Sequence, residues 1–194
     1  MQTIAHHTCG KIGSKESILK NAPFLAQHSP IENLYQFLGT GYYLWDYNLE
    51  FAKRWGDMRY SYGYYIVQFQ VNIPDEFFLD LAGNRMDMEW FLGTKKMLME
   101  LGYDFEHIMA NGKELCIGTY IEFLKRVSKE SGANFFPYLA IRAVDVNSAS
   151  KHFTLKFVEN KRNSTNLNPR FVICILDKKA LVLPHREIVY ESAN

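Results

Sequence analysis

The chain has 194 residues, of which 47% are hydrophobic and 22% are charged, and its formal net charge at pH 7 is +1. This length suits one domain, and the composition is that of an ordinary folded protein, which excludes a disordered or fibrous chain. The near-zero net charge excludes a global electrostatic field that would draw the chain to nucleic acid or to an acidic membrane.

Cysteine spacing and hydropathy further narrow the class of protein to which the chain can belong. Cys9, Cys116 and Cys174 are far apart and lack CxxC spacing, which argues against a disulfide framework and a structural zinc site. The histidines also lack ligand spacing with carboxylates or thiols, so no metal site is expected. No apolar run approaches the roughly 20 residues that span a bilayer, and the first residues lack the layout of a secretion signal. We therefore expect a cytoplasmic protein with no membrane partner.

The first third of the chain predicts alternating strands and helices. Ser14 is a suitable N-cap for a short helix that Pro23 closes, and Asp46 is a suitable N-cap for a second helix that ends at Gly56. Within 64–71, Tyr65, Val67, Phe69 and Val71 fall on one side and Gln68 and Gln70 on the other, an alternation that indicates a strand. The predicted order is strand (3–8), helix (14–22), aromatic strand (35–45), helix (46–56) and strand (64–71).

In the rest of the chain the sequence pattern first becomes helical and then returns to that of strands. Residues 87–101 and 115–127 carry apolar side chains at helical spacing. Strand patterns then return at 138–144, 152–158, 171–176 and 188–190, with a polar loop at 160–168. This order predicts an α+β fold in which helices flank a mostly antiparallel sheet.

Two segments carry a family resemblance. Ala5-His6-His7-Thr8 resembles the first motif of the ADP-ribosyltransferase superfamily, in which a strand-borne His precedes Gly and then Ser or Thr. The segment from Gly39 to Asp46, followed by Ala52, resembles the second motif of poly(ADP-ribose) polymerases and of small bacterial toxin-type transferases. The resemblance covers the first third of the chain well and the last third loosely.

The resemblance implies a single domain over residues 1–194 with a split antiparallel sheet, flanking helices and a helical insertion at about 87–131. It implies an NAD-dependent ADP-ribosyltransferase that cleaves the nicotinamide–ribose bond and transfers ADP-ribose to a macromolecular acceptor, protein or nucleic acid. NAD would be a substrate, and no metal would be needed. Relatives include bacterial toxins and defence effectors, so an antitoxin or regulatory partner is a further expectation.

The resemblance also assigns roles to individual residues. Tyr43 would stack on the nicotinamide, and His6 would hydrogen-bond the adenosine ribose. The backbone of His7 would clasp the carboxamide where relatives have Gly, and Thr8 would contact ribose. The remaining cofactor-binding positions are Gly41, within the second motif, and Phe51, where polymerase-type relatives have Ser.

The third catalytic position has two candidates. Arg186-Glu187-Ile188-Val189-Tyr190 resembles the polymerase Glu-hydrophobic-Val-Tyr signature, which makes Glu187 the expected catalytic carboxylate. Residues 169–174 also resemble the third-motif strand of toxin-type relatives, but no carboxylate occurs at 170–172. Two other functions therefore stay open: an RNA 2′-phosphotransferase, for which Arg170 and Arg186 would hold phosphate, and a non-catalytic NAD-binding or interaction module.

Overall fold

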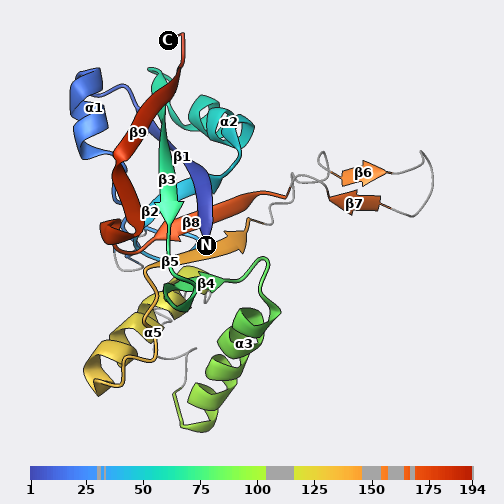
Figure 1. Ribbon diagram of the computed structural model, residues 1–194. Coiled ribbons are helices and arrows are strands. Elements are labelled where there is room, and N and C mark those ends of the chain that lie inside the picture. Colours follow the sequence, from blue (N-terminus) through green and yellow to red (C-terminus); the bar gives the residue numbers. More distant parts are fainter. Residues whose placement is uncertain are drawn as a thin grey trace.

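The computed structural model describes residues 1–29, 32, 34–103, 116–145, 154–156, 164–166 and 169–193. Within these residues the chain is a mixed α/β structure with a seven-stranded, mostly antiparallel sheet and four α-helices. The sheet with α1 and α2 forms one half of the molecule, and α3 and α5 form the other (Figure 1). None of the helices described is long and apolar enough to cross a membrane.

The sheet is built around the two strands that carry the sequence motifs. β1 (Gln2–Gly10) lies at its centre between β2 (Tyr42–Asp46) and β3 (Tyr64–Asn72). Beyond β2 come β8 (Phe171–Ile175), β5 (Ala140–Val144) and β4 (Phe78–Asp80), and beyond β3 comes β9 (Leu181–Glu191). Only the β4–β5 pair is parallel among these neighbours. β6 (Thr154–Lys156) and β7 (Ser164–Asn166) pair separately as an antiparallel ladder.

The predicted alternation of β3 is confirmed. Tyr65, Val67, Phe69 and Val71 lie on one face and belong to the largest core cluster, with side chains of β1 and β8. Ile66, on the other face, is also buried, because α2 (Leu49–Arg59) covers that side of the sheet. The central strands are therefore covered on both faces near the motifs.

The two N-terminal helices begin at capping side chains. Ser14 caps α1 (Lys15–Asn21) as predicted, with its Oγ accepting from the Ser17 N–H at 3.2 Å. The cap of α2 is Asn48, whose Oδ1 accepts from the Phe51 N–H at 3.0 Å. The prediction of Asp46 as this cap was wrong, because Asp46 ends β2 and its carboxylate binds Arg142 at 2.9 Å.

Glycine 56 does not end α2, contrary to the sequence-based expectation. The helix continues to Arg59, and Gly56 is buried against the ring of Tyr64. A Cβ at this position would overlap that ring, so a close approach between helix and strand explains the glycine.

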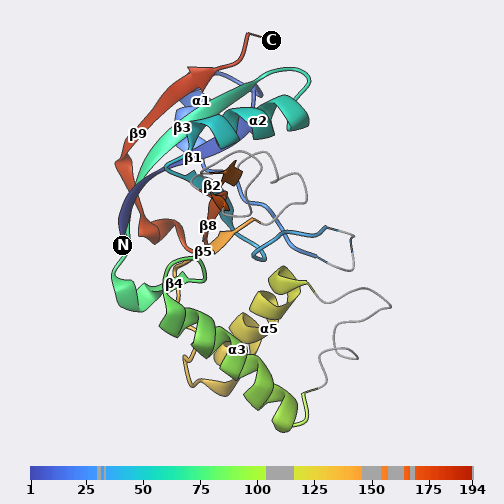
Figure 2. The ribbon, with the colours of Figure 1, turned by 90° about the vertical axis from the view of Figure 1, so that its right-hand side faces the viewer.

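The second half of the molecule is helical, as the apolar spacing predicted. α3 (Arg85–Glu100) and α5 (Ile117–Ser131) lie together beside β4 and β5 (Figure 2). Between the two helices, the ring centroids of Phe91 and Tyr120 lie 5.0 Å apart in an edge-to-face arrangement. Leu79, Ile141 and Cys174 of the sheet join the same core cluster. The segment between the helices, 104–115, lies outside the residues described.

The strand predictions need four corrections. The aromatic strand expected at 35–45 begins only at Tyr42, as β2. β4 was not predicted, because its three buried residues are too few to show a period. β9 begins at Leu181 rather than at residue 188. β7 falls inside the predicted loop 160–168, and the remainder of that loop lies outside the described residues, as do parts of the predicted strand 152–158.

Candidate functional site

A cavity with a volume of about 900 Å³ lies where β1 and β2 separate. The two strands pair only at Ala5↔Asp46 and His6↔Trp45. Beyond this point β1 stays with β3, whereas β2 stays with β8. His7 to Gly10 from β1 and Tyr43 to Trp45 from β2 therefore border one space. The volume lies in the range of small-molecule sites.

Exposed apolar side chains gather around this cavity. Soluble proteins rarely expose many large apolar groups together, and such groups often mark a ligand site. One of these side chains precedes α1, a group of three follows α1, and two belong to or follow the C-terminal part of α2. The exposed apolar side chains that line the cavity are Ile12, Phe24, Leu25, Tyr35, Trp55 and Tyr62.

His7 connects the two separated strands. Its Nδ1 lies 2.9 Å from the carbonyl oxygen of Tyr43, which only accepts, so Nδ1 carries the proton. Its Nε2 accepts from the Phe24 N–H at 3.2 Å. Burial lowers the pKa of His7 to about 4, against a weaker opposing effect of the bond to Tyr43. Both ring nitrogens of neutral His7 are therefore engaged, and its side chain holds the cavity wall together.

Three other residues expected to bind cofactor make contacts within the protein. The Thr8 hydroxyl donates to the Ala52 carbonyl at 2.8 Å and ties β1 to α2. Gly41 packs so closely on Cys174 that a Cβ would overlap its Sγ. Phe51 is buried and its ring centroid lies 5.9 Å from that of Trp45. Of these three, Thr8 lines the cavity.

Tyr43 lines the cavity and is held by its hydroxyl. This oxygen accepts from the Leu38 N–H at 2.7 Å and donates to the Gly39 carbonyl at 2.8 Å. Burial raises the pKa of Tyr43 well above its usual range, so the hydroxyl stays protonated. The ring position is therefore determined by the turn that precedes β2.

Helix α5 supports that turn. The Glu122 Oε1 accepts from the Thr40 N–H at 2.7 Å, and the Thr119 hydroxyl lies 3.0 Å from Nε2 of His28. Nδ1 of His28 in turn accepts from the Gln36 N–H at 2.9 Å. Since Gln36 lines the cavity, this helix of the second half helps to shape the cavity wall.

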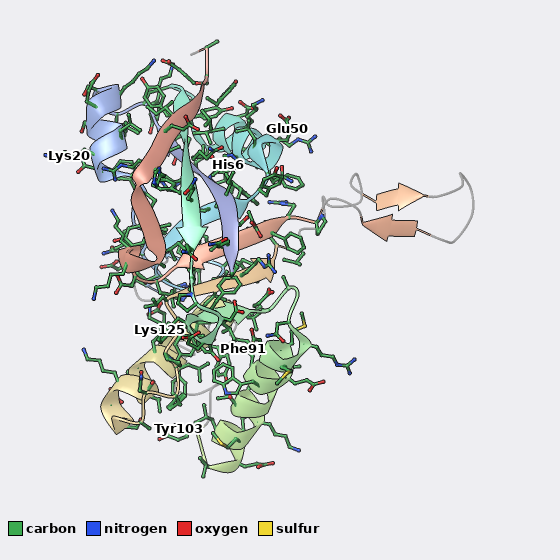
Figure 3. The ribbon with its side chains drawn as sticks, in the orientation of Figure 1. His6, Lys20, Glu50, Phe91, Tyr103 and Lys125 are labelled. Atoms are coloured by element: carbon green, nitrogen blue, oxygen red, sulfur yellow. The ribbon has the colours of Figure 1, made fainter. Side chains whose placement is uncertain are left out.

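His6 and Glu187 lie apart from the cavity-lining residues. Successive strand residues point to opposite faces of a sheet, so His6 faces away from His7. Its Nε2 lies 3.3 Å from Oε1 of Gln68, whose Nε2 donates to Oε1 of Glu187 at 3.0 Å. Figure 3 shows His6 in the upper half of the molecule, beside α2. His6 is buried, its Nδ1 has no partner among the described residues, and burial lowers its pKa. Glu187 is exposed on β9.

The structure thus brings the three predicted catalytic residues, His6, Tyr43 and Glu187, only partly together. His6 and Glu187 are linked through Gln68, whereas Tyr43 borders the cavity with His7 and Thr8.

Among the described lining residues, two carry charged side chains. Asp145 follows β5 and forms an ion pair with Arg170 at 2.6 Å. The Arg170 guanidinium also lies over the rings of Trp45 and Phe51, at 5.5 and 5.8 Å from their centroids. Arg59, near the end of α2, has no ion-pair or hydrogen-bond partner among the described residues. From the part of the chain that the structure describes, the cavity therefore has one unpaired cation and one paired carboxylate.

The sequence had marked part of this wall only in general terms. Aromatic residues concentrate between Tyr35 and Tyr65, and no site was predicted from that concentration. Trp55, Tyr62 and Arg59 are close in sequence, so their clustering was visible. Asp145 carries no local signal, because it reaches the cavity only through the pairing of β5 with β8.

Comparisons with known proteins add no relative. No protein-family model matches the chain, and neither a curated protein nor a solved structure is significantly similar to it. In the described ranges, no three His, Cys, Asp or Glu side chains are grouped so that they would hold a metal ion.

Proposed function

We propose that this chain is an NAD-dependent ADP-ribosyltransferase that binds NAD in the cavity between β1 and β2. It cleaves the nicotinamide–ribose bond and transfers ADP-ribose to a macromolecular acceptor. The fold, on this proposal, is of the ADP-ribosyltransferase type, with the helical half added to it.

One observation carries the proposal. The two segments that resemble the family motifs, 5–8 and 39–46, lie on neighbouring strands that diverge around one cavity. His7, Thr8 and Tyr43 come from these segments and all border it. A resemblance without functional content would not require the two motifs to face a common space.

The cavity also suits the chemistry of a dinucleotide. Aromatic walls provide flat surfaces for a nicotinamide or an adenine ring, a contact worth on the order of 1 kcal/mol beyond area burial. Tyr43 would supply the nicotinamide platform, and Trp55 or Tyr62 a surface for the second ring. Arg59 would neutralise part of the diphosphate charge, since guanidinium groups bind phosphate through paired hydrogen bonds.

The reaction places positive charge on the ribose. The C–N bond breaks with its electron pair moving to the nicotinamide nitrogen, and an oxocarbenium-like C1′ remains. A carboxylate on the cavity wall would stabilise this charge. Because Glu187 does not border the cavity, the proposal gives it no step in the reaction. His7 acts through its backbone and by holding the wall.

A second candidate is a module that binds NAD without cleaving it. The observation that favours it is the ion pair between Asp145 and Arg170, because this pair engages the only carboxylate among the described lining residues.

Titration of the purified chain with NAD, followed by chromatography for free nicotinamide, distinguishes the functions. Binding with nicotinamide release supports the transferase, and binding without release supports the module. Absence of binding contradicts both. A Glu187→Gln variant is the matched control, because that exposed carboxylate lies outside the cavity lining.

A further inference from the structure

We infer that Asp145 is the catalytic carboxylate of this chain, the group that stabilises the oxocarbenium-like ribose when the nicotinamide leaves. This inference rests on the proposed function and assigns within it the role that sequence reasoning gave to Glu187. It concerns a residue that no sequence motif marked.

The position of Asp145 in the sheet supports this role. The strand that begins near Arg170 resembles a third-motif strand but holds no carboxylate of its own. The neighbouring strand β5 ends beside it, and the Asp145 N–H donates to the Arg170 carbonyl at 2.9 Å. The tertiary structure therefore brings the carboxylate that follows β5 to the start of β8, where it lines the same cavity as Trp45 and Val172.

The ion pair with Arg170 is compatible with catalysis. The bond at 2.6 Å uses Oδ2, and Oδ1 has no partner recorded among the described residues. The side chain of Asp145 is 30% exposed, whereas that of Arg170 is only 13% exposed. Arg170 is held by the Trp45 and Phe51 rings, so it fixes the orientation of the carboxylate, and Oδ1, which is unpartnered within the described residues, would accept from a ribose hydroxyl.

The chemical step balances without a further reagent. The C1′–N bond breaks, and its electron pair neutralises the pyridinium nitrogen, so nicotinamide leaves uncharged. Asp145 keeps its negative charge and stabilises the cation at C1′ electrostatically. An acceptor hydroxyl, amine or water then donates an electron pair to C1′ and releases one proton to solvent.

The test compares Asp145→Asn, Asp145→Glu and the control Glu187→Gln in the full-length chain, with NAD as the probe. Asp145→Asn should lower nicotinamide release by about 100-fold or more, while the Kd for NAD changes by no more than about threefold. Asp145→Glu, which keeps a carboxylate, should retain measurable release. Glu187→Gln should behave as wild type.

Chemical rescue separates catalysis from a structural role. In Asp145→Ala, added formate should restore release, because a small carboxylate can occupy the vacated space. An Arg170→Met variant, which lacks the partner but keeps Asp145, should not respond to formate. If Asp145→Ala and Arg170→Met lose nicotinamide release equally and formate does not restore it in Asp145→Ala, the inference is wrong and the ion pair is structural.

The outcomes distinguish a failure of the inference about Asp145 from a failure of the proposed function. If wild type binds NAD and releases nicotinamide, and Asp145→Asn does so at the same rate, the inference is wrong and the proposed function stands. If wild type binds no NAD, the proposed function fails and the inference fails with it.

Discussion

Nδ1 of His7 donates to the backbone carbonyl of Tyr43 across the opening between β1 and β2, at 2.9 Å. This bond joins two strands whose own ladder has ended one residue earlier, at His6↔Trp45. The cavity therefore has a fixed width at its inner end, set by a neutral, buried imidazole.

The buried His7 predicts a pH-dependent stability. Its pKa is about 4 in the folded chain against 6.5 as the ordinary value. Below pH 6.5 the unfolded chain takes up a proton that the folded chain does not, so stability falls as pH falls. The contribution of neutral His7 to the free energy of unfolding is fully present above about pH 6.5, and roughly 3 kcal/mol of it is lost near pH 4.

Denaturant unfolding at pH 7 and pH 5 measures this effect in wild type and in His7→Leu. His6 and His28 also have lowered pKa values, so the difference between the two proteins isolates His7. His185→Gln, at an exposed position, is the control. An equal pH dependence in wild type and His7→Leu would contradict the assignment.

Two substitutions of Tyr43 separate the role of its ring from that of its hydroxyl. Tyr43→Phe keeps the ring but leaves the Leu38 N–H and the Gly39 carbonyl without their partner, so unfolding should become easier by about 1–3 kcal/mol. NAD affinity should stay near wild type. Tyr43→Ala should lower NAD affinity as well, by roughly tenfold. Unfolding curves and NAD titration below the transition check both; unchanged affinity in Tyr43→Ala would refute the stacking role.

The position of Arg59 on the cavity wall predicts a salt-dependent affinity for NAD. Removal of this cation in Arg59→Ala should weaken NAD binding about tenfold at low ionic strength, with a smaller loss at high ionic strength. Titrations at two salt concentrations provide the measurement, and Arg54→Ala on the same helix, outside the cavity lining, is the control. Equal weakening in both variants would indicate a general charge effect instead of a phosphate contact.

Two helical glycines provide a matched pair for the helical half. At Gly118 of α5 an added Cβ would overlap the Gln36 carbonyl and lie 2.8 Å from the Gly39 N atom. At Gly93 of α3 it would meet nothing within 4 Å. Gly93→Ala should raise the free energy of unfolding by about 0.5–1 kcal/mol, because alanine favours the helix.

Gly118→Ala should instead destabilise the chain and reduce NAD affinity, because α5 would be displaced from the turn that carries Gln36 and Gly39. Thermal unfolding of the two variants and NAD titration measure both effects. If Gly118→Ala destabilises the chain without changing NAD affinity, α5 supports the fold but not the cavity.

The sequence by itself determined most elements of this chain. The alternation over 64–71 predicted β3, the spacing of apolar residues predicted α3 and α5, and Ser14 marked the start of α1. These signals are local, because periodicity and capping depend on residues within a few positions of each other. The local signal was wrong at Asp46, because its carboxylate binds Arg142 of a distant strand and Asn48 caps α2 instead.

Only the tertiary structure decided how the site is built. His7 borders the cavity and His6 does not, because the β1–β2 ladder ends at His6↔Trp45 and the cavity begins where the two strands part. Asp145 meets Arg170 because β5 pairs with β8, across a stretch of chain that has no local pattern linking them. Strand pairing and burial arise from contacts between distant residues, so a single sequence carries the residue types of the site but not their arrangement.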